Sequence, residues 1–565
     1  MKHFINEQST NGSSISSTAR ILRNVVRVFA LTFALAFSGL KANNIAVTSV
    51  SLTGRDISAG ANNAANFTLV QFNLSWENSW RVPSGPSNWD AAWVFVKYRI
   101  SGGTWQHAVL NNTGHTAASG STINIGLQTP SSAFNATTNP GLGAFVYRSS
   151  NGAGNNTYNG VQLRWNYGRN GVQDNDVVDI KVFAVEMVYI PSGSFSVGDG
   201  STGFIAGDFR DAASNTPFPI TSEGAITLGG TTAGNLYNNN SISMDSVDDF
   251  SSTVTTTLPA AYPKGVNAYY CMKYEISQQQ YVDFLNTLTR AQQTSCVIVD
   301  VSSGTTSPTM GRRYVLANST TVANRSGVAV DATYHISDPL TFYCDLDGDG
   351  TGGESNDGQW LPCNSMGWTF LASYLDWSGL RPMSEFEFEK ACRGNQTPVP
   401  GEFAWGSTVF NLVTGISNAG QTNETVTPSN ANVNSNHPTT GNPTTGIDGP
   451  VRVGVYATSS SNRESSGAGY YGCMELSGSL WERTVSVGNV SGRLYTGIHG
   501  DGALNASGYA NQSFWPGSTA YGAGRRGGQW TAHNRYWRVA DRWSASMTTP
   551  CTCAWNGGRG VRTAP

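Results

Sequence analysis

The chain has 565 residues, which is too long for a single hydrophobic core and predicts two to four domains. Its formal net charge is −3 and only 13% of its residues are charged, so no basic stripe is present that could neutralise the phosphates of a nucleic acid. Glycine, serine, threonine and asparagine are abundant, with 16 tryptophans and 22 tyrosines. This composition is typical of exported β-rich proteins and suits contacts with sugars, although most of the aromatic residues are expected to pack in cores.

The first 42 residues have the pattern of a secretory signal peptide. A positive segment contains Arg20, Arg23 and Arg27. The apolar run 28–37 (VFALTFALAF) follows it and is too short for a membrane span, and Ala42 is the expected cleavage residue. An uncleaved N-terminal anchor is the alternative, but the polar sequence after Ala42 favours cleavage. We therefore expect an exported protein, extracellular or at the cell surface, with no membrane span after removal of the signal peptide.

Residues 43–185 contain no cysteine and predict an antiparallel β-sandwich-like domain. Apolar and polar residues alternate in 70–76, 161–165 and 180–184, as expected for strands with one buried face. Residues 92–100 form another predicted strand, which a glycine pair turns back towards Trp105. Turn-rich polar segments separate these strands. The region shows no acid–base pair, metal cluster or nucleophile motif, so adhesion and simple spacing both stay open as its role.

Residues 186–565 form the second predicted domain. Long loops are expected over 199–260, which is rich in glycine and small polar residues. Residues 273–290 predict an amphipathic helix, and residues 384–393 predict a second one that begins with a capping box between Ser384 and Glu387. Glu385, Glu387 and Glu389 should point in different directions around that helix, so we expect structural rather than catalytic roles for them.

Seven blocks occur in a fixed order in this second domain. They are 187–198 (MVYIPSGSFSVG), 274–285 (YEISQQQYVDFL), 380–394 (LRPMSEFEFEKACRG), 403–406 (FAWG), 472–484 (GCMELSGSLWERT), 527–530 (GGQW) followed by 538–542 (RVADR), and 560–562 (GVR). Their order and content resemble the formylglycine-generating enzyme, or sulfatase-modifying factor, family. The resemblance implies a loop-rich variant of the C-type lectin fold. The whole chain is thus predicted to be α+β, with the β-sandwich-like domain first.

The resemblance also implies a chemistry, because the aerobic enzymes of the family oxidise a cysteine of a sulfatase peptide to formylglycine. They use Cu(I) held by two cysteines, whereas related domains serve other pathways or act as binding modules. The corresponding stretch here, 527–538, contains no cysteine, and Ala532 stands where the first copper thiolate is expected. Linear S–Cu(I)–S binding needs two soft thiolates, so copper is not expected at this place.

Other residues could still supply ligands. Cys551 and Cys553 would place two sulfurs on one face of an extended strand, but a disulfide from each of them to another cysteine is favoured in an exported chain. The even count of eight cysteines permits disulfides, and their pairing stays open. His533 and His499 are candidate imidazole ligands, although a lone histidine in a loop more often makes ordinary hydrogen bonds. The candidate ligand-binding residues are Trp530, Arg538, Arg542 and His499, and the candidate catalytic residues are Cys551, Cys553 and His533.

Two calcium sites are implied by the resemblance. The first would use Asn432 with the Val433 carbonyl, or Asn434, together with Asp448 and the Pro450 carbonyl. Hard oxygen ligands of this kind suit Ca²⁺. The second would use Ser479 and Glu482, and it is weaker because serine is a poorer ligand than the asparagine of the family pattern.

A third candidate calcium site follows from the residues themselves. Asp345, Asp347 and Asp349 with the next glycine form the D-x-D-x-D-G start of a calcium loop. The twelfth position is Asn356 instead of glutamate, and Asp357 comes after it. A polar turn is the alternative interpretation, but three carboxylates so close together repel one another unless a cation or water screens them.

Two functions from different classes follow from these observations. The first is a non-catalytic, calcium-stabilised binding or surface-assembly module that recognises a glycan or a protein at the cell surface. In it the β-rich domain serves as a stalk or second contact, and self-association is open. The second is a metal-dependent oxidoreductase of the formylglycine-generating type that acts on a cysteine of a protein substrate. The missing thiolates favour the first.

Overall fold

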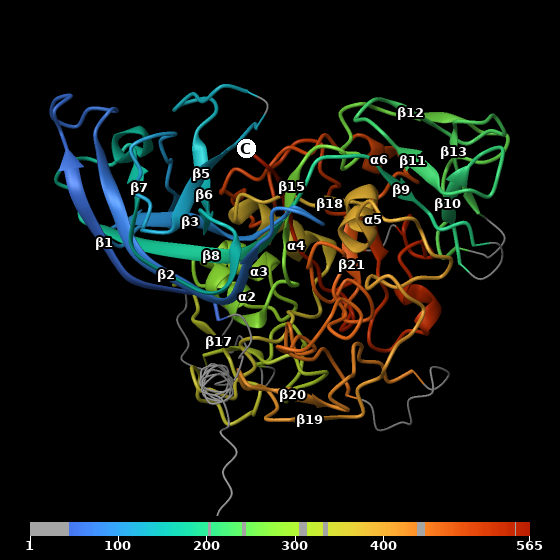
Figure 1. The fold of residues 1–565 in the computed structure, drawn as a ribbon. Coiled ribbons are helices and arrows are strands. Elements are labelled where there is room, and N and C mark those ends of the chain that lie inside the picture. The colour runs from blue at the N-terminus through green and yellow to red at the C-terminus, as the bar shows by residue number, and fades with distance from the viewer. Residues whose placement is uncertain are drawn as a thin grey trace, which may run out of the picture. The chain divides into compact units, whose positions relative to one another are not determined.

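The computed structural model describes residues 44–130, 132–201, 205–239, 244–303, 313–331, 337–437, 447–547 and 550–565. The predicted signal peptide lies outside these residues. The described part belongs to one compact unit. It is mostly β structure with a few short helices, so the predicted α+β class is confirmed only in that both strands and helices occur, with strands predominating (Figure 1). None of the described helices is long and apolar enough to cross a membrane.

Eight strands make up the N-terminal β-rich region. They are β1 (Ala46–Asp56), β2 (Phe67–Arg81), β3 (Asp90–Ile100), β4 (Gln106–His107), β5 (Ser121–Leu127), β6 (Gly141–Arg148), β7 (Gly152–Trp165) and β8 (Val178–Ile190), with the short helix η1 (Tyr167–Asn170) after β7. Strands β1, β2 and β7 pair antiparallel in one group, and β3 to β6 with β8 pair antiparallel in another. The four strands predicted from sequence are thereby confirmed.

A shared core explains the sequence patterns of these strands. Val70, Phe72 and Leu74 of β2 are at most 1% exposed and belong to one hydrophobic cluster with residues of β7, β3 and β6. Strand β3 contributes to this cluster with one face and to a second, larger cluster with the other. Because both of its faces are buried, residues 92–100 form a nearly continuous apolar run instead of an alternating one.

Strand β8 joins the β-rich region to the rest of the chain. Its residues 178–188 pair with β3, and its C-terminal end also pairs with β15 (Tyr269–Met272), which in turn pairs with β23 (Val561–Thr563). The sheet therefore runs in the order β23-β15-β8-β3-β6-β5. Hydrogen bonding thus continues through residues 185 and 186, where the sequence predicts the domain boundary.

The C-terminal region contains short strands and helices connected by long loops. The remaining strands are β9 (Phe195–Val197), β10 (Asp208–Asp211), β11 (Phe218–Ile220), β12 (Ile226–Leu228), β13 (Leu236–Asn239), β14 (Thr256–Leu258), β16 (Val328–Val330), β17 (Phe342–Cys344), β18 (Met383–Ser384), β19 (Gly415–Ser417), β20 (Thr425–Thr427), β21 (Glu482–Val485) and β22 (Ala523–Arg526). The helices are α2 (Gln278–Leu285), α3 (Arg290–Ser295), α4 (Trp368–Trp377), α5 (Glu385–Arg393), α6 (Val490–Arg493) and η3 (Asn534–Trp537). Five of the short strands, β10 to β14, lie within 199–260, which was predicted to form loops.

Capping explains where the predicted helices begin. Of the predicted helix 273–290 only 278–285 is helical, as α2, and a second helix, α3, begins at residue 290; Ser277 caps α2 and Thr289 caps α3, each in a complete capping box. The predicted capping box of α5 is confirmed. The Glu387 amide donates to Ser384 Oγ at 3.1 Å, and Glu387 Oε2 accepts the Ser384 amide at 3.0 Å.

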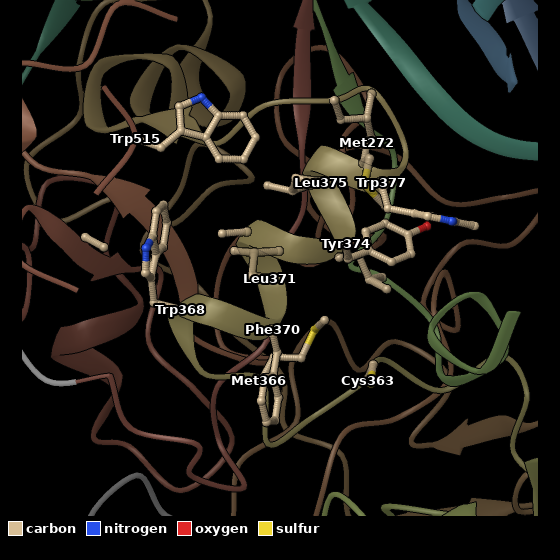
Figure 2. Packing of buried hydrophobic residues seen from close by; sticks show 14 of the residues in the cluster. Met272, Cys363, Met366, Trp368, Phe370, Leu371, Tyr374, Leu375, Trp377 and Trp515 are labelled. Carbon is tan, nitrogen blue, oxygen red and sulfur yellow. The ribbon is translucent and has the colours of Figure 1, made fainter. Parts of the chain in front are cut away.

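Helix α4 was not predicted from sequence. It is buried on all sides, and its side chains project in several directions into the surrounding core (Figure 2). Its C-terminal residue Trp377 lies 5.0 Å from Phe95 of β3 and 5.4 Å from Phe284 of α2, measured between ring centroids. Its polar residues Thr369, Ser373 and Asp376 form only a narrow stripe, and every residue except Thr369 is buried, so the sequence is mostly an apolar run and its amphipathic period is weak.

Candidate functional site

The loop 527–538, which the resemblance equates with the copper-binding stretch, follows β22 and includes η3. Gly527 and Gly528 have φ angles of 82° and 68°, and a Cβ on Gly528 would overlap the Trp537 ring, so the turn requires glycine. The Trp530 amide donates to the Ser479 carbonyl at 3.1 Å and ties the loop to the segment 472–484. Ala532 is 7% exposed, and no residue of the loop carries sulfur.

Three rings form an aromatic cluster that includes Tyr536 of this loop; the other two are Trp481 and Trp543. The ring centroids of Trp481 and Tyr536 are 6.1 Å apart, and those of Tyr536 and Trp543 are 4.8 Å apart. Trp481 is buried, whereas Tyr536 and Trp543 are half-buried and so keep part of their surface open. The Arg525 guanidinium lies 5.2 Å from the Trp481 ring centroid, and burial lowers the pKa of Arg525 to about 10. The cluster thus combines open aromatic surface with a nearby cation.

The cysteines supply no thiolate to the loop 527–538, although the buried Cys271 and Cys473 lie within hydrogen-bond distance of one another elsewhere in the domain. Cys551 and Cys553 are at disulfide distance from one another, and residues 551–553 lie outside any strand. The other six cysteines are free and buried: Cys271, Cys296, Cys344, Cys363, Cys392 and Cys473. Burial favours the neutral thiol, and it raises the pKa of Cys296, for example, to about 12. The donor set around Ala532 therefore does not fit Cu(I), which would need two thiolates at one place.

The two candidate histidines occupy different surroundings. His533 lies in the loop beside the aromatic cluster, where its ring centroid is 5.6 Å from that of His437 and its Nδ1 accepts the Arg535 amide at 3.2 Å. Partial burial and the neighbouring His437 lower the pKa of His533, which favours the neutral ring. His499 is fully buried, and its Nε2 accepts the Thr563 amide of β23 at 3.1 Å. His499 therefore holds a strand in the interior and is not open to a ligand.

The candidate ligand-binding residues Arg542, Arg538 and Trp530 also differ in their burial and in their partners. Arg542 is fully buried, and it forms ion pairs of 2.6 Å with Asp248 and 2.7 Å with Glu385. Arg538 is half-buried, donates to the Gly401 carbonyl and lies 5.1 Å from the Phe403 ring centroid. Trp530 is 4% exposed, and its indole N–H has no hydrogen-bond partner among the described residues.

The carboxylates of α5 belong to the interior. Glu385 and Glu389 both bind the Arg526 guanidinium, at 3.0 Å and 2.6 Å, and Glu387 forms a two-point ion pair with Arg381 at 2.6 and 2.8 Å. All three are at most 1% exposed. The prediction that they point in different directions is wrong for Glu385 and Glu389, because residues four apart share a helix face. The contacts themselves are those of a structural ion-pair network.

At the first calcium site implied by the resemblance, four of the candidate oxygens already accept a hydrogen bond from the chain, whereas the buried Asn434 Oδ1 has no hydrogen-bond partner among the described residues. The pairs are Asn432 Oδ1 with Asn411 N (2.8 Å), Val433 O with Val413 N (3.0 Å), Pro450 O with Arg325 Nη1 (3.0 Å), and Asp448 Oδ1 with Asn436 Nδ2. Asp448 itself is exposed. The Arg325 guanidinium beside the Pro450 carbonyl disfavours a cation there.

At the second implied site an arginine likewise supplies the positive charge. Ser479 Oγ donates to Glu275 Oε2 at 2.8 Å, and Glu482 pairs with Arg559 at 2.5 Å, with the three charged side chains at most 1% exposed. Burial, followed by the Glu482 charge, raises the pKa of Glu275 well above its usual value. The Arg559 guanidinium offsets the negative charge that a calcium ion would otherwise neutralise.

The acidic loop is the third candidate, and it brings together more carboxylates than the sequence predicted. Asp345, Asp347 and Asp349 place carboxylate oxygens within 4.8 Å of one another. Asp347 forms a second such group with Glu354 and Asp357. The repulsive charge of Asp349 raises the pKa of Glu354 above its usual range. Counting twelve positions leads to Asn356, so spacing alone could not identify Glu354 and Asp357. A carboxylate-rich set of this kind fits a hard cation such as calcium.

The comparisons with known proteins agree with the motif order. The profile of the sulfatase-modifying factor enzyme 1-like domain, named FGE-sulfatase, matches residues 179–564. A search of curated proteins gives no significant match. The matched range begins within β8 and ends within the last residues of the chain, so it includes the loop 527–538 and the acidic loop. The chain therefore belongs to the FGE-sulfatase (sulfatase-modifying factor 1-like) family, with a β-rich region preceding the family domain.

Proposed function

We propose that this protein is an exported, non-catalytic binding module of the family, and that the aromatic cluster is its contact surface for a glycan. One observation carries the proposal: Ala532 replaces the expected thiolate, and Tyr536 of the same loop packs its half-buried ring near that of Trp543, which is also half-buried. Aromatic faces stack on the apolar faces of sugars, and neighbouring polar groups bind the hydroxyls.

The surroundings of the cluster support a neutral polar ligand. Arg525 donates to Asn556 Oδ1 at 3.3 Å, so a guanidinium and an amide lie together next to Trp481. Trp555 is 37% exposed, and its carbonyl accepts the Trp481 amide at 2.9 Å, which places a further indole on an adjoining loop. A lectin-like fold of the family domain, which the resemblance implies, would suit this role.

The rest of the chain would assist the module. The signal-like segment 1–42 supports export, and the β-rich region 43–185 would act as a spacer or second contact. Calcium would stabilise the fold without taking part in chemistry, and self-association could raise the avidity for a repetitive surface ligand.

The proposal is tested by binding of the purified protein to a glycan array and by titration of the strongest hit. Tyr536→Ala and Trp543→Ala should each weaken binding by at least about tenfold, because each removes an aromatic contact at the centre of the surface. Phe514→Ala is the matched control, since Phe514 is an exposed aromatic (57%) outside the cluster, and it should leave binding unchanged.

Two results would change the proposal. Binding to peptides instead of glycans, lost in the same two variants, would make the ligand a protein. Oxidation of a sulfatase-type peptide by the purified protein, without glycan binding, would replace the binding module by the oxidoreductase.

A further inference from the structure

The acidic loop 345–357 has a backbone arranged around its carboxylates. Gly348 and Gly350 have φ angles of 84° and 91°, and their amides donate to Asp345 Oδ1 at 3.2 and 3.3 Å. Asp347 and Asp349 follow at alternate positions, and their oxygens lie within 4.8 Å of an Asp345 oxygen. Repulsion among three carboxylates at this distance opposes the observed conformation unless a positive charge enters the loop.

Asp357 provides a second, independent observation that points to cation binding. This residue is completely buried, and its Oδ1 has no hydrogen-bond partner among the described residues. Its Oδ2 accepts the Glu354 amide at 2.6 Å, and a carboxylate oxygen of Asp357 lies within 4.8 Å of Asp347 and Glu354. A buried carboxylate oxygen without a partner is costly, so a cation at this position would remove a large penalty.

We propose that the acidic loop binds one Ca²⁺ through the carboxylates of Asp345, Asp347, Asp349, Glu354 and Asp357. Asp347 belongs to both carboxylate groups and therefore joins them into one site. The negative charge of five carboxylates is larger than the single positive charge of the neighbouring arginine, Arg313. Among the described residues only Arg313 forms an ion pair with the loop, with Asp345 at 2.7 Å. Calcium accepts six to eight oxygen ligands in flexible geometry, which suits carboxylates drawn from a long loop.

The site has a structural consequence that does not depend on the proposed glycan binding. Just after Asp357, the Gly358 amide donates to the Gly420 carbonyl at 3.1 Å, and the Leu361 carbonyl accepts the Gln278 amide of α2 at 2.9 Å. Bound calcium would hold the connection between β17 and these two contacts. Calcium is therefore expected to raise the unfolding temperature of the protein.

Terbium(III) luminescence tests the site directly, because this ion takes the same oxygen ligands and emits when a nearby tyrosine is excited. The Tyr314 hydroxyl donates to Asp345 Oδ2 at 2.9 Å, so bound terbium should be sensitised and then displaced by calcium. Asp347→Asn and Asp357→Asn should each lower the affinity of the protein for both terbium and calcium by at least about tenfold. Asp347 is exposed, so its variant should fold normally even if the buried Asp357→Asn variant does not.

Asp179→Asn and Asp448→Asn are the matched controls. Asp179 is an exposed acid paired with Arg99, and Asp448 belongs to the first implied family site. Both variants should keep the affinity of the wild type at the acidic loop. The proposal is overturned if millimolar calcium or terbium does not bind the wild-type protein, or if Asp347→Asn leaves the affinity unchanged. Loss of binding in Asp448→Asn alone would also overturn it.

Discussion

Replacing Arg526 by methionine removes the centre of the ion-pair network under α5. The guanidinium donates to Glu385 Oε2 at 3.0 Å, to Glu389 Oε1 at 2.6 Å and to the Val539 carbonyl at 2.6 Å, and Arg526 and both glutamates are fully buried. Methionine fills similar space but supplies neither the charge nor the hydrogen bonds.

The expected loss of unfolding free energy depends on which cationic partners Glu385 and Glu389 retain in the variant. Breaking a buried ion pair by removing one partner costs roughly 3–5 kcal/mol. Glu385 retains Arg542, and Glu389 retains Arg393 at 3.2 Å, so neither carboxylate is left without a cation. We therefore expect a loss at the lower end, ~3 kcal/mol.

Equilibrium unfolding in urea, followed by tryptophan fluorescence, measures this loss. Arg99→Met is the matched control, because Arg99 forms a surface pair with Asp179 in which the side chains are 39% and 51% exposed. That pair should contribute less than ~1 kcal/mol. A loss below ~1 kcal/mol for Arg526→Met as well would refute the view that this network stabilises the fold.

Two further predictions concern the same region. Burial raises the pKa of Glu475 from its usual 4.5 to about 7, so its contribution to stability is complete below pH 4.5 and is lost as the pH rises through 7. Glu475→Gln keeps an acceptor for the Gly454 amide, and in urea titrations it should be more stable than the wild type above pH 7 and less dependent on pH. Gly478→Ala should lower the unfolding temperature more than Gly60→Ala. Both glycines have positive φ angles (89° and 110°), but a Cβ on Gly478 would overlap the Val433 side chain, whereas Gly60 has open space. Equal effects of the two alanines would contradict the close packing at Gly478.

The sequence predicted those elements whose signals are local. Alternation identified β2 and β7, and the capping box at Ser384 identified the start of α5. The break between α2 and α3 was missed, although Thr289 carries a capping signal of the same kind. Helix α4 was missed because it is buried almost throughout and mostly apolar, so that its polar stripe is narrow.

The candidate site was predictable only where neighbours in space are neighbours in sequence. The absence of sulfur around Ala532 was visible directly, as was the D-x-D-x-D-G start of the acidic loop. The pairing of Arg526 with Glu385 joins residues 141 positions apart, and no sequence pattern indicates it. The role of Asp357 in the acidic loop could not be predicted from spacing either, because this residue lies one position beyond the twelfth position of a calcium loop and reaches Asp347 and Glu354 only in the folded chain.

The central claim is that the family domain of this chain binds without oxidising. It is tested most directly by incubating the copper-treated protein, under oxygen, with a cysteine-containing sulfatase-type peptide and measuring the aldehyde by mass spectrometry. For a domain that binds without oxidising we expect no aldehyde and no stoichiometric copper in the protein. Aldehyde formation that disappears when Cys551 and Cys553 are replaced by serine would contradict it and would establish a relocated thiolate centre.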